Sequence, residues 1–205
     1  PPILAEHRLK IDVDLRPEGK NGPLVRSLES YADYYERWAE TWERQALLRA
    51  RQFAGDEEVG RKFIELIDPV RYQHGLSDKE LQEIRRVKAR VEGERLPRGV
   101  NPRRHVKLGP GGLSDVEWLV QSMQLRFAKR HPGLQTTNTL EALRAGHHAG
   151  LISQEDAESL ETAWKLATDV RAANMACTGR ASDSFPSSRS EISAVATWIG
   201  WGKDA

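Results

Sequence analysis

The spacing of hydrophobic residues changes once along this chain, from every second position to every third or fourth. Residues 8–15 alternate between charged and apolar side chains, with the apolar ones at Leu9, Ile11, Val13 and Leu15. A period of two is typical of a β-strand with one buried face and one polar face. The proline and glycine residues at 17–23 predict that this strand ends in a loop. No second strand is predicted after it.

From residue 28 onward, apolar residues recur at helical spacing, and serine, glycine and proline residues mark the expected helix ends. The predicted helices cover residues 28–41, 42–53, 57–67, 77–94, 114–130, 139–149, 153–177 and 191–199. Pro69 is expected to close the third of these helices, and Ser190 to cap the last. The serine-rich segment 179–189 lacks periodicity and is predicted to be a mobile loop. The predicted fold class is therefore mainly α, a multi-helix bundle preceded by a short β-strand.

Two pairs of residues have the S-x-x-E spacing of a capping box, Ser77 with Glu80 and Ser114 with Glu117. In such a box each side chain accepts a hydrogen bond from an otherwise unpaired backbone N–H at the start of a helix. The second box follows a Gly/Pro loop and precedes an apolar stripe that begins at Val116. The pattern predicts a well-capped, half-buried helix at this point.

Composition narrows the class of protein. The chain has 205 residues, 30% of them charged, and a formal net charge of +1. No apolar run approaches the roughly 18 residues that span a membrane, and the near-neutral charge argues against a general nucleic-acid or membrane binder. The single cysteine, Cys177, is typical of a reducing cytoplasm. We expect a cytoplasmic protein without nucleic-acid or membrane partners, and the start at Pro1-Pro2 predicts part of a longer chain.

The predicted strand carries candidate chemistry. Asp12 and Asp14 are two residues apart, so a strand places both carboxylates on one face, and Arg16 shares that face. Carboxylates of this kind hold Mg²⁺, which neutralises a triphosphate and activates an incoming hydroxyl. Arg16 is then a candidate contact for phosphate. A bare D-x-D pattern is more commonly a solvated strand face, and both interpretations stay open at this point.

A second candidate lies in the basic segment from Arg95 to Lys107, which runs through a Gly/Pro-rich loop. The segment favours contact with nucleotide phosphates or with an acidic protein surface, and it is also typical of an exposed linker. Backbone N–H groups at 111–113 are placed to hold an anion at a helix start. Asp115 and Glu117 already put negative charge there, which weakens such a site.

Two blocks of sequence then point to a family. Residues 11–25 read IDVDLRPEGKNGPLV and residues 107–121 read KLGPGGLSDVEWLVQ. The first resembles the last nucleotidyltransferase motif of the glutamine synthetase adenylyltransferase family, and the second resembles the signature of that family's helical domain. The resemblance implies that residues 1–56 are the C-terminal part of a polymerase-beta-like nucleotidyltransferase domain. It implies that residues 57–205 form the helical bundle domain that follows.

The resemblance also implies an activity. Members of this family transfer AMP from ATP to a tyrosine of glutamine synthetase with Mg²⁺, a sister domain removes it by phosphorolysis, and a PII protein signals nitrogen status. Asp12 matches the family's third metal carboxylate and is the expected catalytic residue, with Asp14 as a second metal candidate. Arg16 and Lys107 are the expected nucleotide contacts. The two aspartates that follow a Gly-Ser turn in the family are missing upstream of Asp12, so this chain alone is expected to be inactive.

Two alternatives stay open. The first is a helical docking or regulatory module that binds glutamine synthetase or PII. The second is a fragment of a PII uridylyltransferase, an enzyme that shares a related helical domain. Between the two catalytic halves of the adenylyltransferase family, the sequence blocks resemble the C-terminal, adenylylating half more closely.

Overall fold

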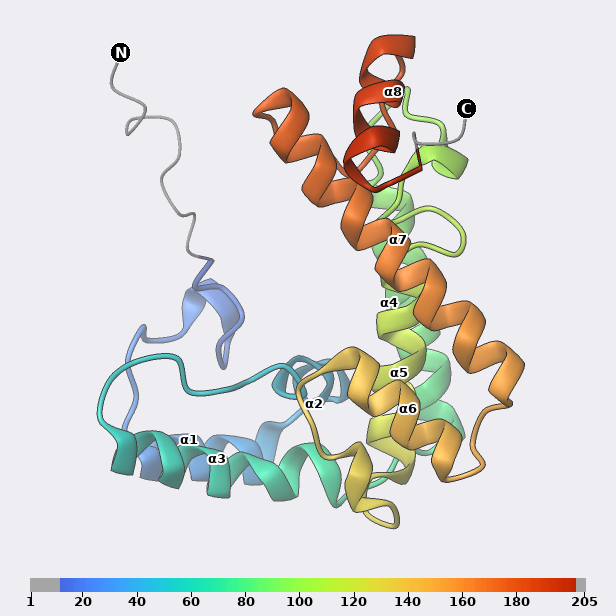
Figure 1. Ribbon diagram of the computed structural model, residues 1–205. Coiled ribbons are helices and arrows are strands. Elements are labelled where there is room, and N and C mark those ends of the chain that lie inside the picture. Colours follow the sequence, from blue (N-terminus) through green and yellow to red (C-terminus); the bar gives the residue numbers. More distant parts are fainter. Residues whose placement is uncertain (1–11, 202–205) are drawn as a thin grey trace. The chain divides into compact units, whose positions relative to one another are not determined.

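The computed structural model describes residues 12–201, and its regular structure there is helical (Figure 1). Two compact units divide the chain, Pro1–Arg71 and Tyr72–Ala205, and each is described by itself. The elements of the first unit are η1 (Gly19–Asn21), α1 (Leu28–Trp38), α2 (Thr41–Leu47) and α3 (Glu57–Tyr72). Those of the second are α4 (Asp78–Arg95), η2 (Pro102–Arg104), α5 (Leu113–Phe127), η3 (Pro132–Leu134), α6 (Thr139–His148), α7 (Gln154–Thr178) and α8 (Arg189–Trp198).

In the first unit, α1, α2 and α3 enclose a small aromatic and aliphatic core. Its buried members are Tyr35, Leu47, Ile67 and Val70. The ring of Tyr31 meets that of Phe63 edge-on, with the centroids 5.1 Å apart. The chain breaks between α1 and α2, where the Glu40 and Glu43 side chains form a reciprocal capping box. The first predicted helix ends at Trp38 and not at residue 41, and the second ends at Leu47 and not at residue 53.

Pro69 lies inside α3, which continues to Tyr72. The prediction that Pro69 closes this helix was wrong. Proline removes one backbone hydrogen bond and crowds the preceding turn, but Ile67 and Val70 on either side are both buried in the core of the first unit. Burial of those side chains outweighs the local penalty and keeps the last turn helical.

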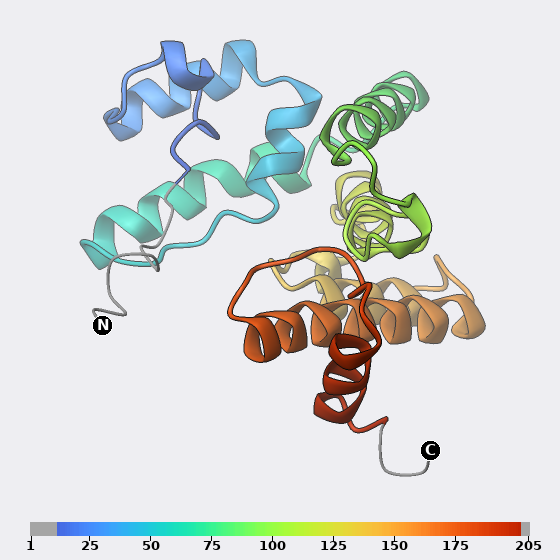
Figure 2. The same cartoon turned by 90° about the horizontal axis from the view of Figure 1, so that it is seen from above.

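In the second unit, α7 is the longest element and contacts α5, α6 and α8 (Figure 2). The apolar cluster beneath it contains Val106, Leu113, Ala167, Val170, Ala173 and Val195, with Trp164 packed against it. Two ion pairs show that α4 runs antiparallel to α5. Asp78 at the start of α4 pairs with Arg126 near the end of α5, at 3.2 Å. Further along, Lys88 pairs with Asp115 at the start of α5. The predicted helical bundle is confirmed.

The predicted strand at 8–15 is not seen in its described part. Residues 8–11 lie outside the described range, and residues 12–15 are irregular. Among residues 12–201 the β pairing is a single isolated bridge, between His105 and Ser184. A strand needs a neighbour to satisfy its backbone groups, and within the described chain these residues have none, so their alternating pattern does not produce a strand.

Two predicted caps were also wrong. Helix α5 begins one residue early with Gly112 at its N-cap, and Ser114 is buried inside the first turn. Helix α8 is capped by Ser188, whose hydroxyl accepts from the Glu191 N–H at 3.2 Å. The Ser77–Glu80 box at the start of α4 is confirmed. Within residues 12–201, no helix combines the length and the apolar character that crossing a membrane requires.

Candidate functional site

The predicted metal carboxylates lie in a turn of the first unit and not on a strand. The Asp12 carboxylate accepts a hydrogen bond from the Asp14 N–H at 2.9 Å, which closes a local side-chain turn. Both aspartates are exposed. The two carboxylates thus lie in one turn and are open to solvent. Exposed carboxylate oxygens can serve as some of the ligands of a hard cation such as Mg²⁺.

Arg16 closes the same turn from the other side. Its guanidinium donates to the carbonyl oxygen of Gly22, at 3.3 Å from Nε and 3.1 Å from Nη2, and also to the Val13 carbonyl. It lies 3.6 Å from the Asp14 carboxylate. The structure thus brings Arg16, Asp12 and Asp14 into one turn, although by a route different from the predicted strand face.

A cavity of about 260 Å³ adjoins this turn within the first unit. It is lined by Leu15, Arg16, Pro17, Tyr35, Trp42, Glu43, Ala46, Leu47, Arg49 and Ala50. Asp12 and Asp14 are not among the lining residues, so the cavity adjoins the turn on the side of Arg16. Its wall combines two arginines with a half-exposed tryptophan, side chains that suit phosphate and an aromatic base respectively.

One polar network in this wall was missed by the sequence reasoning. Glu43 is only 5% exposed, and its carboxylate accepts from the Tyr34 hydroxyl at 2.8 Å and from the Glu40 N–H at 3.0 Å. Burial, together with the hydrogen bond to Glu43, raises the pKa of Tyr34. A signal for this network was present in the sequence. Residues 43–45 are polar and precede Leu47 in one short helix, and all four are buried. Buried polar side chains need hydrogen-bond partners.

Arg71 fixes the end of α2 against α3. Its side chain is 6% exposed, and Nη1 donates to the carbonyl oxygens of Leu47 and Ala50 at 2.8 and 2.9 Å. Asp68 pairs with the same guanidinium at 2.7 Å. Carbonyls at a helix C-terminus lack an intrahelical donor. Arg71 donates to the Ala50 carbonyl and adds a second donor to that of Leu47, which also accepts from the Ala50 N–H at 2.9 Å, and it thereby orders the segment beside the cavity.

The second candidate, the glycine-rich turn around Lys107, belongs to the second unit. Its backbone donors are already used inside the chain: the Leu113 N–H donates to the Val106 carbonyl and the Ser114 N–H to the Lys107 carbonyl, both at 2.9 Å. The Gly111 N–H donates to the Asp115 carboxylate at 2.7 Å. A bound anion would have to compete with these bonds, so the backbone of this turn does not form an anion site.

The glycines of this turn are explained by close packing. A Cβ on Gly109 would lie 2.1 Å from the Pro102 carbonyl oxygen, and one on Gly112 would lie 2.6 Å from that of Val106. Only glycine fits such approaches. The N-cap of α5 has no side-chain hydrogen bond; Asp115 instead accepts from the Gly111 N–H in the preceding turn and also pairs with Lys88. Burial opposes the charge on Lys88, but the hydrogen bonds to Asp115 and Glu92 outweigh it and raise its pKa.

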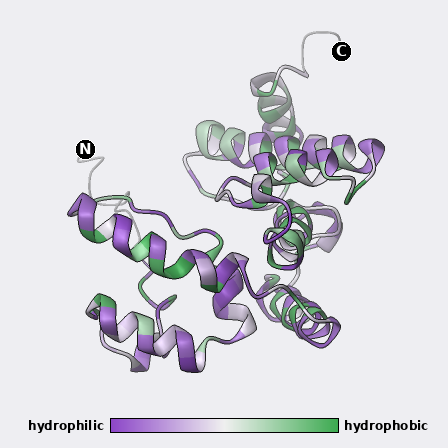
Figure 3. Ribbon diagram, turned by 90° about the horizontal axis from the view of Figure 1, so that it is seen from below, coloured by the Kyte–Doolittle hydropathy of each residue, from purple (hydrophilic) through white to green (hydrophobic). Residues whose placement is uncertain are grey.

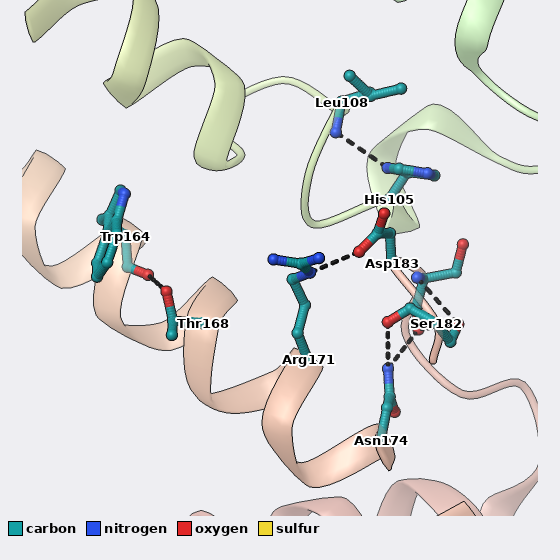
Figure 4. Close-up of polar contacts among 9 residues, drawn as sticks. His105, Leu108, Trp164, Thr168, Arg171, Asn174, Ser182 and Asp183 are labelled. Atoms are coloured by element: carbon teal, nitrogen blue, oxygen red, sulfur yellow. Dashed lines mark hydrogen bonds and ion pairs between the residues drawn. The ribbon is translucent and has the colours of Figure 1, made fainter. Parts of the chain in front are cut away.

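Contacts with the serine-rich segment hold the basic loop in place (Figure 4). The Val106 N–H donates to the Asp183 carbonyl at 2.7 Å, and the Phe185 N–H donates to the Arg104 carbonyl at 2.8 Å. Asn174 on α7 donates to the Ser184 carbonyl at 2.9 Å. Of the predicted loop 179–189, residues 179–188 contain no helix and Arg189 begins α8; these bonds tie the middle of the loop to two other elements. The Lys107 side chain is exposed.

No group of three or more His, Cys, Asp or Glu side chains able to hold a metal ion occurs within residues 12–201. Asp12 and Asp14 can supply oxygen ligands of the type that Mg²⁺ prefers, but as a partial set. Their role as metal ligands, and the roles of Arg16 and Lys107, stay predictions.

Two family models match successive parts of the chain. Residues 6–66 match the model described as glutamate-ammonia ligase adenylyltransferase. Residues 79–205 match the model described as GlnD PII-uridylyltransferase. The first match contains the Asp12–Arg16 turn, and the second contains the glycine-rich turn and the helices α5 to α8.

Curated relatives match across nearly the whole chain. A bifunctional glutamine synthetase adenylyltransferase/adenylyl-removing enzyme of Streptomyces coelicolor is 58% identical over 199 residues, which cover 97% of this chain and 20% of that protein. Enzymes of the same description from Mycolicibacterium smegmatis and Mycobacterium tuberculosis are 50% and 49% identical, over 98% and 96% of this chain. The chain belongs to the GlnD PII-uridylyltransferase family through residues 79–205, and over nearly its full length it is similar to the bifunctional glutamine synthetase adenylyltransferase/adenylyl-removing enzymes. It spans about a fifth of the length of those relatives.

Proposed function

We propose that this chain is part of an enzyme that transfers AMP from ATP to a tyrosine of glutamine synthetase and, in a sister domain, removes it by phosphorolysis. The observation that supports the proposal is the joint match of residues 6–66 and 79–205 to two family models, with relatives of the bifunctional description over 97% of the chain. A PII protein is the proposed regulatory partner. The proposal places the reaction in the cytoplasm, in keeping with the single cysteine.

The Asp12–Arg16 turn is the proposed reactive part. In this proposal Asp12 is a metal carboxylate, Asp14 is a secondary ligand, and Arg16 contacts a phosphate from the rim of the cavity. A bound Mg²⁺ would neutralise phosphate charge and activate the tyrosine hydroxyl. Arg16 lies 3.6 Å from Asp14, which favours a role for Arg16 in orienting that carboxylate. Lys107 is a proposed nucleotide contact through its exposed side chain alone.

The direct test is AMP transfer from labelled ATP to purified glutamine synthetase by the full-length parent enzyme. Asp12→Asn is expected to lower the rate by more than about 100-fold, because it removes a charged metal ligand. Asp14→Asn, matched in chemistry and exposure, is expected to lower it by about 10-fold or less. Unchanged transfer by Asp12→Asn would contradict the proposal for this turn.

A helical docking module is the second candidate function. It is favoured by the match of residues 79–205 to a family model named for a PII-modifying enzyme, and by the partial carboxylate set. AMP transfer and docking can be distinguished by comparing the activity of the parent enzyme with the binding of the 205-residue chain. If the parent transfers AMP equally well with Asp12→Asn, while the 205-residue chain binds glutamine synthetase or PII, the docking function is favoured.

A further inference from the structure

Helix α4 of the second unit has one side buried or half-buried and one side exposed to solvent. Its buried and half-buried apolar residues are Leu81, Ile84, Val87 and Val91. Its exposed residues on the opposite side are Gln82, Arg85, Arg86, Ala89, Arg90 and Gly93, which recur at helical spacing. Figure 3 shows this helix coloured largely hydrophilic. We call Arg85, Arg86, Arg90, Ala89 and Gly93 the α4 basic face.

The cations of the α4 basic face are not used to hold the fold. Across residues 12–201, Arg85 and Arg90 take part in no ion pair or side-chain hydrogen bond. Arg86 makes one weak contact, from Nε to the Gln82 carbonyl at 3.4 Å. The attachment of α4 to α5 uses other residues, Lys88 and Asp78. Three guanidinium groups are therefore available to a partner.

Gly93 is a second, independent feature of this face. It lies in the last two turns of α4, where glycine costs about 0.5–1 kcal/mol relative to alanine. A Cβ built there meets nothing within 4 Å, so packing inside the chain does not require glycine. Ala89 lies one turn earlier, so Ala89 and Gly93 form a strip of small side chains between the arginines, which we call the low strip. Such a strip admits the close approach of another backbone or surface.

The charges of α4 are divided between its sides. Residues 78–95 contain 6 Lys and Arg residues and 5 Asp and Glu residues. Among the carboxylates, Glu80 belongs to the helix cap, Asp78 pairs with Arg126, and Glu92 pairs with Lys88. Arg85, Arg86 and Arg90 therefore form a positive surface on one side of a helix whose net charge is small.

We propose that the α4 basic face docks an acidic surface of a protein partner. The inference rests on the proposed function, in which the substrate is itself a protein. Arginine suits this role because its planar fork pairs with carboxylates in a bidentate manner. A protein is favoured over a nucleic acid because the face has no aromatic residue for base stacking and because Glu83 and Glu94 interrupt the positive charge.

The test measures binding of the 205-residue chain to purified glutamine synthetase at 50 and at 300 mM NaCl. The wild type is expected to bind at low salt and to weaken at high salt. Arg85→Gln with Arg86→Gln and Arg90→Gln is expected to weaken low-salt binding by about 10-fold or more. The matched control replaces Lys129, Arg130 and Arg180, which are also exposed, by glutamine. The control removes the same charge and is expected to change binding by less than about 2-fold.

A further variant separates docking from folding. Gly93→Leu fits the open space beside the helix and is expected to keep or raise the melting temperature, because leucine is a better helix former. It is expected to weaken binding by about 5-fold, because its side chain blocks the low strip. Equal losses in the α4 triple variant and in the control, or unchanged binding by both the α4 triple variant and Gly93→Leu, would overturn the proposal.

Two further measurements complete the experiment: binding of alternative ligands, and kinetics of the full-length parent. Duplex DNA and vesicles with anionic phospholipid serve as alternative ligands. The proposal is overturned if the wild type binds either of these but not glutamine synthetase, or if it binds none of the three. In the full-length parent, the α4 triple variant is expected to raise KM for glutamine synthetase by about 10-fold with kcat and the KM for ATP unchanged. If the parent transfers no AMP, the proposed function fails, and the direct binding measurement still decides on docking.

Discussion

The two glycine-containing turns use their carboxylates in different ways, although backbone N–H groups pair with backbone carbonyls in both. In the first, residues 12–22, the Arg16 side chain closes the turn onto the carbonyl of Gly22, and Asp12 and Asp14 are exposed. In the second, residues 105–115, the Asp115 carboxylate accepts from the Gly111 N–H and pairs with Lys88. The first turn leaves its carboxylates at the surface, whereas the second uses its carboxylate to hold the turn and α4 in place. Composition alone does not separate these roles.

The largest expected effect tests the second turn. Gly109→Ala places a Cβ 2.1 Å from the Pro102 carbonyl oxygen and is expected to lower the free energy of unfolding by about 3 kcal/mol. Gly22→Ala makes a similar clash, 2.3 Å from the Pro17 carbonyl oxygen. It is expected to cost less than about 1 kcal/mol, because its turn exposes most of its residues. Urea unfolding of both variants measures the difference, and equal losses would show that the first turn is also part of the folded framework.

The next effect compares two arginines that both bind carbonyls. Arg71→Met removes the side-chain donor of the Leu47 and Ala50 carbonyls in a buried place and leaves Leu47 with its bond from the Ala50 N–H alone; it is expected to cost about 2–3 kcal/mol. Arg16→Met exposes its carbonyl partner to water and is expected to cost about 0.5 kcal/mol. Thermal unfolding checks both values. If Arg16→Met lowered the free energy of unfolding more than Arg71→Met does, Arg16 would be the structural residue and would not be available to bind a ligand.

The smallest effect concerns pH. Hydrogen bonds from Arg144 and Lys165 lower the pKa of Glu161 to about 2, against an ordinary value of 4.5. Its ion pairs therefore stabilise the second unit above pH 4.5, and this contribution is lost as the pH falls from 4.5 toward 2. Because the pairs are partly exposed, Glu161→Gln is expected to cost less than about 1 kcal/mol at pH 7. The difference from wild type should shrink at pH 2.5, and a constant difference in chemical unfolding would argue against the ion pairs as its source.

Local signals predicted the fold where helix ends are set by nearby residues. Ser77 with Glu80 and Ser153 mark helix starts as expected, because capping depends on a few neighbouring groups. The prediction failed at Pro69 and Ser114, where burial against other elements decided the outcome. The strand at 8–15 depended on a neighbouring strand, which a local pattern cannot supply. Long-range packing is the part that sequence spacing does not contain.

The sequence predicted that Asp12, Asp14 and Arg16 lie together, but not the geometry that brings them together, and their functional roles stay predictions. The D-x-D pattern and Arg16 were identified correctly as neighbours, and the contact of Arg16 with Asp14 follows from their spacing. The cavity beside them and the buried Glu43 depend on how α1 and α2 pack. The contact of Asp115 with the Gly111 N–H was not predicted, because the sequence spacing of Ser114 and Glu117 indicated a capping box that does not form when Gly112 is the N-cap.

One pair of variants tests the central contrast most directly: Asp12→Asn and Asp115→Asn in the full-length parent enzyme. AMP transfer to glutamine synthetase and the melting temperature are measured on each. The account predicts that Asp12→Asn abolishes transfer with an unchanged melting temperature. It predicts that Asp115→Asn lowers stability by about 1–2 kcal/mol while the folded enzyme transfers AMP at the wild-type rate. Loss of transfer in well-folded Asp115→Asn, with retained transfer in Asp12→Asn, would contradict it.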